Sequence, residues 1–166
     1  MKILLLSDSH RLYDELQAVI DEWRDAVDYI FHLGDSELPM TDPLWDRVDA
    51  VVAGNMDFHA GYLAEATIAT EEGRALLIHG HLHPLDQLHY LAEDRQVEMI
   101  FHGHTHRPYA DYDAGLLRVN PGSLKHNRAS LMDRSYAVVS YSANMVQVVF
   151  YSPLDHRQLD ALVFER

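Results

Sequence analysis

Residues 3–10, Ile-Leu-Leu-Leu-Ser-Asp-Ser-His, join a short apolar run directly to a polar group. The run Ile3–Leu6 is the pattern of a strand that is buried on both faces. Asp8 and His10, which follow it, carry side chains that bind metals or catalyse reactions. A helix is expected over residues 12–23, where apolar residues recur at helical spacing. The beginning of the chain therefore predicts a buried strand, a polar strand end and a helix.

The same arrangement of an apolar run and a polar end recurs four more times along the chain. The further cases are Tyr29–Leu33 before Gly34-Asp35, Ala50–Ala53 before Gly54-Asn55-Met56-Asp57, Leu76–Ile78 before His79-Gly80-His81, and Val97–Phe101 before His102-Gly103-His104-Thr105-His106. Loops at the carboxyl ends of strands converge on the site in α/β folds, and glycine allows close approach there. Each motif alone is weak, but five in chain order are very hard to explain by coincidence. We therefore expect the five strand ends to meet at one site.

The two halves of the chain differ in character. The first half alternates strand and helix, with a hairpin expected around Glu71-Glu72-Gly73 and a helix from Pro84 to about Asp94. Short β-prone runs fill the last third, and they are Tyr109–Tyr112, Leu116–Val119, Tyr136–Tyr141 and Met145–Tyr151. This change predicts an α/β fold with two mixed β-sheets packed as a sandwich flanked by helices. The length favours a single domain over residues 1–166.

The composition excludes several classes of protein. There are 13 Lys and Arg residues against 26 Asp and Glu, which gives a net charge of −13, and there are 12 histidines but no cysteine. A chain without cysteine has no disulfides and no thiolate metal site. The negative charge argues against binding nucleic acid or an anionic membrane. No apolar run approaches a membrane span, and Met1–Leu6 has no signal-peptide cleavage site, so a cytoplasmic protein is expected.

The polar strand ends have the chemistry of a metal site. Carboxylate and carboxamide oxygens with imidazole nitrogens, and no sulfur, suit divalent manganese, iron, cobalt, nickel, zinc or magnesium. The groups are numerous enough for two ions. Two divalent cations would outweigh the charges of Asp8 and Asp35, so the inferred site is positive inside an acidic protein and should attract a small anion.

The motif order resembles that of the calcineurin-like metallophosphoesterases. The matching motifs are Asp8-x-His10, Gly34-Asp35, Gly54-Asn55, His79-Gly80-His81 and Gly103-His104-Thr105-His106. Asn120-Pro121-Gly122-Ser123 is also similar to a turn of the small single-domain bacterial and archaeal phosphodiesterase branch. The resemblance implies the metallophosphoesterase αββα fold. It also implies a dinuclear metal-dependent phosphoesterase, a phosphodiesterase rather than a monoesterase, in which a metal-bridging hydroxide attacks a small phosphate ester.

The resemblance also implies a role for each motif residue. The first metal would be held by Asp8, His10, Asp35 and His106, and the second by Asp35, Asn55, His79 and His104. Asp35 would bridge the two divalent ions, for which manganese is expected ahead of iron, nickel, zinc, cobalt or magnesium. Activity should fall at acid pH, because histidine ligands must be neutral to bind a metal.

Two positions depart from the family pattern. Met56 stands where many members have a histidine that helps to protonate the leaving group. His81 is the nearest candidate to take over this proton transfer, ahead of His32 or His83. Arg11 stands where the family often has glycine. A solvated side chain at a helix start is the favoured interpretation of Arg11, and bidentate binding of a substrate phosphate is the alternative.

Several polar residues have two interpretations. Asp57 either orients a metal ligand or belongs only to a turn, and Asn120 either faces the site or serves turn chemistry. His32 and His102 lie inside β-prone runs and are expected to be buried polar residues rather than ligands.

Two other functions compete with the phosphoesterase. The same fold resembles the phosphoesterase-like subunit of the retromer coat, so a catalytically weak or inactive interaction scaffold is the first alternative. A nuclease is less favoured, because the net charge is −13 and no Lys- or Arg-rich run is present. The expected partner is a small phosphate ester, with no membrane and no nucleic acid, and assembly into a dimer or larger oligomer is left open.

Overall fold

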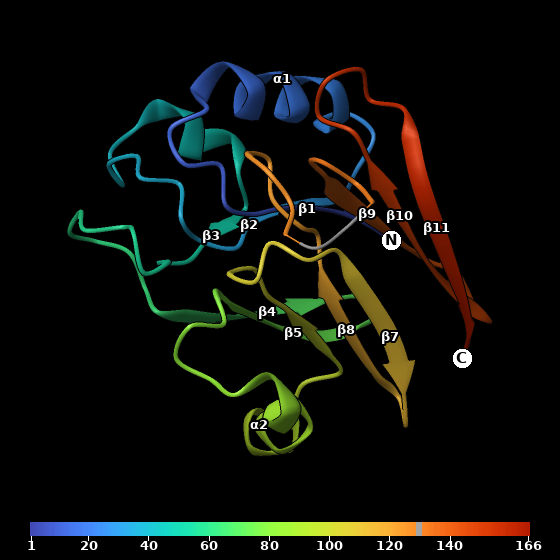
Figure 1. Cartoon of the computed structure of the whole chain (residues 1–166). Helices are drawn as coiled ribbons and strands as arrows, with labels where there is room; N and C mark the ends of the chain where they lie inside the picture. The colour runs from blue at the N-terminus through green and yellow to red at the C-terminus, as the bar shows by residue number, and fades with distance from the viewer. Residues whose placement is uncertain (129–130) are drawn as a thin grey trace.

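Two mixed β-sheets pack face to face in this computed structural model, with helices on their outer sides (Figure 1). The structure describes residues 1–128 and 131–166. The first sheet contains β1 (Lys2–Leu6), β2 (Tyr29–His32), β3 (Ala50–Val51), β9 (Tyr136–Tyr141), β10 (Met145–Tyr151) and β11 (Gln158–Glu165). The second contains β4 (Glu65–Thr70), β5 (Gly73–Ile78), β6 (Met99–Phe101), β7 (Tyr109–Asp113) and β8 (Leu116–Asn120). The helices are α1 (Tyr13–Trp23), α2 (Leu88–Arg95) and the short 3-10 helices η1 (Pro43–Arg47) and η2 (Leu85–Gln87).

The strand orders confirm the predicted sandwich. The first sheet runs β11-β10-β9-β1-β2-β3, and the second runs β4-β5-β6-β8-β7. β1 is parallel to β2 and antiparallel to β9, while β5, β6 and β8 are mutually parallel. Both sheets therefore mix parallel and antiparallel pairs.

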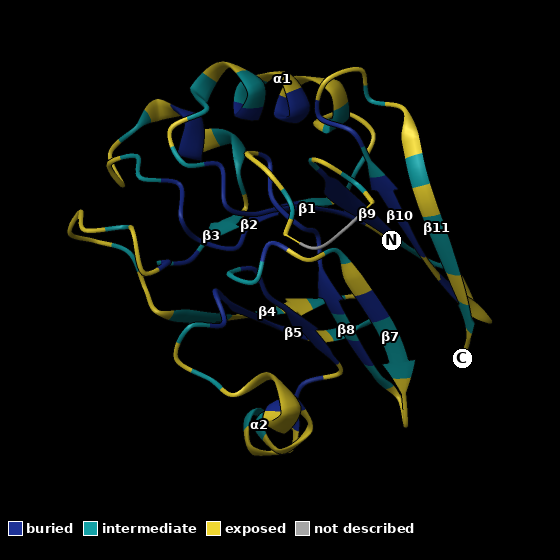
Figure 2. Ribbon diagram, viewed as in Figure 1, coloured by how far each residue is buried: buried dark blue, intermediate teal, exposed yellow. Residues whose placement is uncertain are grey.

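β1 is apolar at every position after Lys2 because both of its faces are buried. Ile3 and Leu5 enter the core between the two sheets, while Leu4 and Leu6 lie in the core beneath α1. The strands in the middle of Figure 2 are dark blue, the colour of buried residues. β5 behaves in the same way, because its alternate side chains face the other sheet and α2.

The helices close the outer faces of the sheets. α1 places Leu16, Val19 and Ile20 on the first sheet, as the helical spacing of its apolar residues predicts. α2 packs Leu88 and Ala92 on the outer face of the second sheet. Among the described residues, no helix is both long enough and apolar enough to pass through a lipid bilayer.

Three elements differ from the sequence expectations. β11 was not expected, because it is an edge strand whose exposed positions do not alternate regularly with buried ones. β3 is only two residues long. The helix expected from Pro84 begins as the 3-10 turn η2, and the α-helix starts at Leu88. Edge and terminal positions such as these depend on packing partners that are distant in sequence.

Candidate metal centre

The ends of the parallel strands are held together by backbone hydrogen bonds between loops. The N–H groups of Asp8 and His10 donate to the carbonyl oxygens of Gly34 and Asp35, each at 3.0 Å. Gly103 N–H donates to the carbonyl oxygen of His79 at 2.9 Å. The loops after β1, β2, β5 and β6 therefore meet at one place, as the sequence predicts.

The backbone at this place is strained. Five predicted ligands have left-handed φ angles between +43° and +68°, and they are Asp8, His10, Asp35, His104 and His106. Each such conformation costs on the order of 1 kcal/mol and persists only where the surrounding structure enforces it. Gly34 has a φ of +95°, and a Cβ atom there would lie 2.7 Å from Gly54 N. Glycine is therefore required where the second and third strand ends approach each other.

Three histidines are oriented by acceptors outside the cluster. His79 Nδ1 lies 2.7 Å from the carbonyl oxygen of Leu33, and His106 Nδ1 lies 3.0 Å from that of His126. His10 Nδ1 lies 2.9 Å from Glu37 Oε1. A carbonyl or carboxylate oxygen only accepts, so each Nδ1 carries the proton and donates it. A lone pair therefore remains on the Nε2 atom of each neutral ring, as in most metal-binding histidines.

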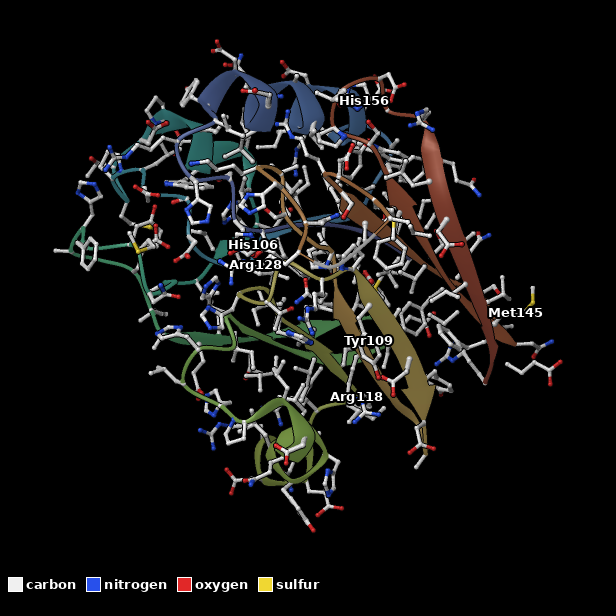
Figure 3. All side chains as sticks on the ribbon, in the orientation of Figure 1. His106, Tyr109, Arg118, Arg128, Met145 and His156 are labelled. Carbon is white, nitrogen blue, oxygen red and sulfur yellow. The ribbon has the colours of Figure 1, made fainter. Side chains whose placement is uncertain are left out.

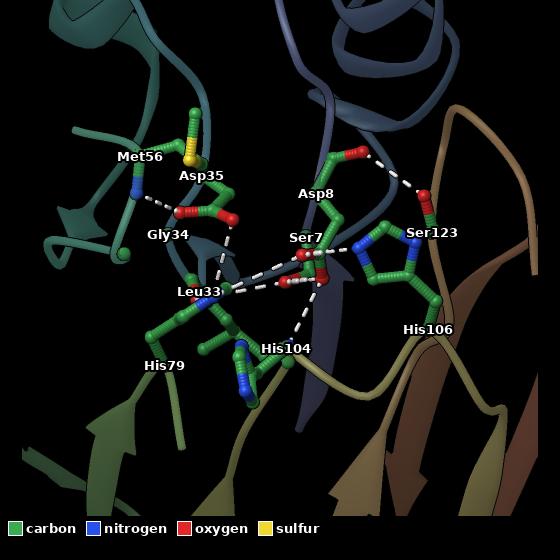
Figure 4. Close-up of polar contacts among 12 residues, drawn as sticks. Ser7, Asp8, Leu33, Gly34, Asp35, Met56, His79, His104, His106 and Ser123 are labelled. Atoms are coloured by element: carbon green, nitrogen blue, oxygen red, sulfur yellow. Dashed lines mark hydrogen bonds and ion pairs between the residues drawn. The ribbon is translucent and has the colours of Figure 1, made fainter. Parts of the chain in front are cut away.

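These Nε2 atoms converge on two buried carboxylates, and Figure 4 shows His106 beside Asp8 and His79 beside Asp35. His106 Nε2 lies 2.9 Å from Asp8 Oδ1, and His79 Nε2 lies 3.4 Å from Asp35 Oδ2. His10 Nε2 lies 3.9 Å from both Asp8 Oδ1 and Asp35 Oδ2. Electron-rich atoms thus face one another at short range inside the protein, an arrangement that a bound cation would stabilise.

The residues present fit divalent metal ions. Asp8 Oδ1 and His79 Nε2 are buried and have no hydrogen-bond partner among residues 1–128 and 131–166. Two groups offer ligand atoms that all lie within 4.8 Å of one another, namely Asp8 with His10 and His106, and Asp8 with Asp35 and His79. A pair of cations would satisfy the unpaired atoms of both groups. Asp8 is common to the two groups, so the bridging role of Asp35 stays a prediction.

The other predicted site residues lie around this cluster. The His104 ring centroid is 5.1 Å from that of His79, and its backbone N–H donates to Asp8 Oδ2 at 3.2 Å. The His81 ring lies 5.4 Å from His79 and 6.1 Å from His104. Asn55 is exposed in the turn after β3, and its side chain joins none of the hydrogen bonds described for the cluster. Its role as a ligand therefore stays a prediction.

The electrostatics keep both carboxylates ionised. Burial, the largest single influence, raises the pKa of Asp8, but contact with His106 and the charge of His79 outweigh it and lower the pKa below 3.8. Burial also raises the pKa of Asp35, but the close approach and charge of His79 more than offset it and lower the pKa overall. Burial lowers the pKa of His79, yet Asp35 and Asp8 raise it overall. Two ionised carboxylates beside imidazoles are the donors that a divalent ion requires.

Asp57 binds the loop that carries Asp35. Its carboxylate accepts hydrogen bonds from Asp35 N (2.7 Å), Gly54 N (2.8 Å) and Glu37 N (2.7 Å). It also accepts from Ser36 Oγ at 3.1 Å. Of the two interpretations of Asp57, the structure therefore supports the one in which it positions a predicted ligand.

Sequence reasoning missed three residues that organise the site. Glu37 orients His10. Ser123 Oγ donates to the carbonyl oxygen of Asp8 at 3.0 Å. Arg128 N–H donates to the carbonyl oxygen of His106 at 2.7 Å, and both residues lie near the middle of the molecule in Figure 3. The local signals were the position of Glu37 two residues after Asp35 and that of Ser123 at the end of the Asn120-Pro121-Gly122-Ser123 motif.

Asn120 lies beneath the loop that carries His104 and His106. Its Nδ2 atom donates to the carbonyl oxygen of Gly103 at 2.8 Å and to Thr105 Oγ1 at 3.0 Å. Its Oδ1 atom accepts from Gly122 N at 2.9 Å. Asn120 thus serves turn chemistry, as one of its two interpretations has it, and it also supports the ligand loop from beneath.

Replacing Glu37 with glutamine should weaken metal binding. The neutral amide accepts a weaker hydrogen bond from His10 Nδ1, and loss of such an orienting partner typically costs 10–100-fold in affinity. Calorimetric titration of chelated protein with manganese measures the change. Glu71→Gln is the matched control, because Glu71 lies in the β4–β5 turn and the one hydrogen bond described for its side chain, within residues 1–128 and 131–166, comes from Tyr29 OH at 3.5 Å. Equal affinities for Glu37→Gln and wild type would contradict the orienting role.

Buried His32 and His102 should couple stability to pH. Burial lowers the pKa of each ring from 6.5 to about 4. Between these values the unfolded state binds protons that the folded state does not, so folding is favoured above pH 6.5 and disfavoured as pH falls toward 4. The loss is roughly 3 kcal/mol for each ring. Urea unfolding of chelated protein at pH 7 and 4.5 measures it.

Substitution of either buried ring should make stability less sensitive to pH. His32→Gln and His102→Gln should each reduce the loss of unfolding free energy between pH 7 and 4.5. His59→Gln is the control, because His59 is exposed. If His32→Gln and His59→Gln gave the same pH dependence as wild type, burial of a neutral His32 would not explain the acid sensitivity.

An αββα sandwich with carboxylates and imidazoles at its strand ends is the architecture of a metal-dependent phosphoester hydrolase. The chain belongs to the calcineurin-like phosphoesterase superfamily, whose domain model matches residues 1–144. It is 35% identical over 155 residues to the Bacillus subtilis (strain 168) protein YsnB, named a probable metallophosphoesterase, with 91% of this chain and 90% of that protein covered.

Solved structures are similar as well. A predicted phosphoesterase from Streptococcus pneumoniae TIGR4 superposes with a TM-score of 0.93 at 33% identity, covering 99% of this chain and 97% of that one. An archaeal phosphodiesterase shares the fold, with a TM-score of 0.68 at 16% identity over 99% of this chain and all of that one. The family and the αββα fold expected from the motifs are thus confirmed.

Proposed function

We propose that this protein is a dinuclear metal-dependent phosphoesterase that hydrolyses a small phosphate ester and prefers diesters to monoesters. The convergence of three imidazole Nε2 atoms on two buried carboxylates supports this most directly. Two bound divalent ions, manganese in the first instance, would neutralise phosphate charge and lower the pKa of water enough to supply a nucleophile near neutral pH. The proposal places the enzyme in the cytoplasm.

The chain itself supplies orientation and positive charge. Glu37, Leu33 and the His126 carbonyl hold the three rings so that their lone pairs face the carboxylates. Burial is the main cause of the lowered pKa of His104, the charge of His79 is the next, and the positive charge of Arg128 acts in the same direction. A cationic side chain beside the cluster favours an anionic ester over a neutral one.

His81 is the proposed proton donor to the leaving group, since Met56 has no proton to give. Burial and the neighbouring His79 and His104 lower the pKa of His81, so its rate contribution should grow as pH falls toward that pKa. His81→Ala should therefore slow hydrolysis of an alkyl ester by roughly 10²-fold and of a 4-nitrophenyl ester far less. Equal losses on both esters would exclude His81 as the acid.

A scaffold without catalysis is the competing function. Such a protein needs an exposed apolar patch. Phe58 is 83% exposed and Leu63 is 65% exposed, both in the loop that follows Asn55. Buried carboxylates and imidazoles that could hold metal ions are what a metal-dependent hydrolase needs, and two exposed apolar side chains in one loop are compatible with an enzyme, so we favour catalysis.

The decisive experiment uses bis(4-nitrophenyl) phosphate and 4-nitrophenyl phosphate with manganese or nickel. We expect metal-dependent release of 4-nitrophenolate, faster from the diester, and none after chelation. Metal should also raise the melting temperature, because an ion at 100 times its Kd adds about 2.7 kcal/mol to the stability of the folded state. If metal binds and raises stability without any turnover, the scaffold is favoured instead.

A further inference from the structure

Arg11 keeps a large side chain at a position where the backbone favours glycine. Its φ is +65°, in the left-handed region, and its N–H donates to the carbonyl oxygen of Ser36 at 3.0 Å. Glycine would adopt this conformation without penalty. Strain of this kind at a site is evidence that the side chain itself has a task.

Glu37 fixes the guanidinium of Arg11 next to the metal centre. Arg11 Nε lies 2.9 Å from Glu37 Oε2, while the other carboxylate oxygen, Oε1, lies 2.9 Å from His10 Nδ1. The Glu37 side chain is only 16% exposed, so its carboxylate is held in one position. Glu37 therefore bridges His10, a predicted metal ligand, and the guanidinium of Arg11.

The outer end of Arg11 is free to bind a ligand. Its side chain is 76% exposed. Its shortest contact with a carboxylate is through Nε, and no hydrogen bond from either terminal nitrogen is described among residues 1–128 and 131–166. By contrast, the terminal nitrogens of Arg95, Arg118 and Arg166 lie against carboxylates. The two free N–H edges of a guanidinium match a phosphate group in a bidentate manner.

The order His10, Glu37, Arg11 also determines which phosphate group of a substrate Arg11 can contact. The Glu37 carboxylate stands between the guanidinium and the His10 ring, so Arg11 lies outside the cluster that would hold the scissile phosphate. Arg11 would therefore contact a second anionic group of the substrate, next to the scissile phosphate. In a chain with a net charge of −13, a second phosphate needs such a local cation.

We propose that Arg11 makes the site selective for phosphodiesters that carry a second, terminal phosphate group. Glu37 is the positioning residue that holds Arg11 and His10 in the required relation. The inference rests on the proposed phosphodiesterase activity and adds a substrate class to it.

A matched pair of esters tests the proposal. The two are thymidine 3′-(4-nitrophenyl phosphate) with and without a 5′-phosphate, assayed on the metal-loaded full chain. In both, the oxygen of water forms a new bond to phosphorus, the bond to 4-nitrophenolate breaks, and the protons of water go to the phosphate product and to solvent. The products are thymidine 3′-phosphate and thymidine 3′,5′-bisphosphate. We expect wild type to prefer the 5′-phosphorylated ester by about tenfold in kcat/KM, the size of one charge-assisted hydrogen bond.

Arg11→Gln should remove most of this preference, mainly through KM. Arg11→Lys should retain part of it, because lysine keeps the positive charge but cannot bind phosphate in a bidentate manner. Arg157→Gln is the matched control. Arg157 also pairs through Nε with a carboxylate, that of Asp155 at 3.2 Å, and is 69% exposed. It follows His156, which lies near α1 and away from His106 in Figure 3. Its substitution should leave the preference intact.

The outcomes separate the two proposals. If metal-loaded wild type cleaves neither ester, the phosphodiesterase itself is refuted. If wild type cleaves both at the same rate, or if Arg11→Gln slows both equally, the phosphodiesterase stands and the role of Arg11 is overturned. Metal content, measured on each variant, shows whether a loss on both esters reflects an emptied metal site.

Discussion

Asp35→Asn should lower kcat/KM for an activated diester by roughly 10³-fold. The substitution removes one negative charge and the Oδ2 lone pairs that lie 3.4 Å and 3.9 Å from the Nε2 atoms of His79 and His10. It preserves the rest of the local structure. Asparagine tolerates the left-handed φ of +55°, and its amide oxygen still accepts from Met56 N, which is 2.7 Å from Oδ1.

The measurement combines turnover with metal content. Wild type should contain two ions per chain after loading, and Asp35→Asn should contain fewer, with an unchanged far-ultraviolet circular dichroism spectrum. Asp160→Asn on the exposed β11 strand is the control and should match wild type in both respects. An Asp35→Asn protein that retains more than a tenth of wild-type activity with two ions bound would refute the bridging role.

The polar strand ends were the predictable part of this protein. A strand that is apolar at every position, such as Ile3–Leu6, has to be covered on both faces, and the structure covers it with a second sheet and with α1. Parallel strands bring their carboxyl ends to one edge. The convergence of Asp8, Asp35 and His79 follows from these two facts.

The orienting groups were not predictable, because they depend on distances across the fold. Glu37 reaches His10 from 27 positions away, and Ser123 reaches Asp8 from 115 positions away. Neither contact leaves a periodic signal in the sequence. The left-handed backbone at the ligands is equally hidden, since Asp and His adopt a positive φ more often than most residues but still in only a small minority of cases. β11 was missed for a related reason, because an edge strand is stabilised mainly by the single neighbour with which it pairs.

Asp57→Asn should destabilise the protein strongly even without metal. The Asp57 carboxylate accepts four hydrogen bonds, three of them from backbone N–H groups of the loops that carry Asp35 and Gly54. An amide in its place turns an N–H₂ group toward these donors and leaves buried N–H groups unpaired. Hydrogen bonds to charged groups contribute about 1.5–3 kcal/mol each and are not additive, so a total loss of about 3 kcal/mol is expected.

A thermal melt of chelated protein measures this effect. For a chain of this size, about 3 kcal/mol corresponds to a decrease of about 6–12 °C in melting temperature. Asp42→Asn is the matched control, because Asp42 accepts one hydrogen bond, from Leu44 N at 2.9 Å, as the N-cap of η1, and asparagine caps equally well. Because the melt is made without metal, a large decrease for Asp57→Asn alone shows that Asp57 builds the Asp35 loop before any ion binds. Equal melting temperatures for the two variants would instead reduce Asp57 to an ordinary turn residue.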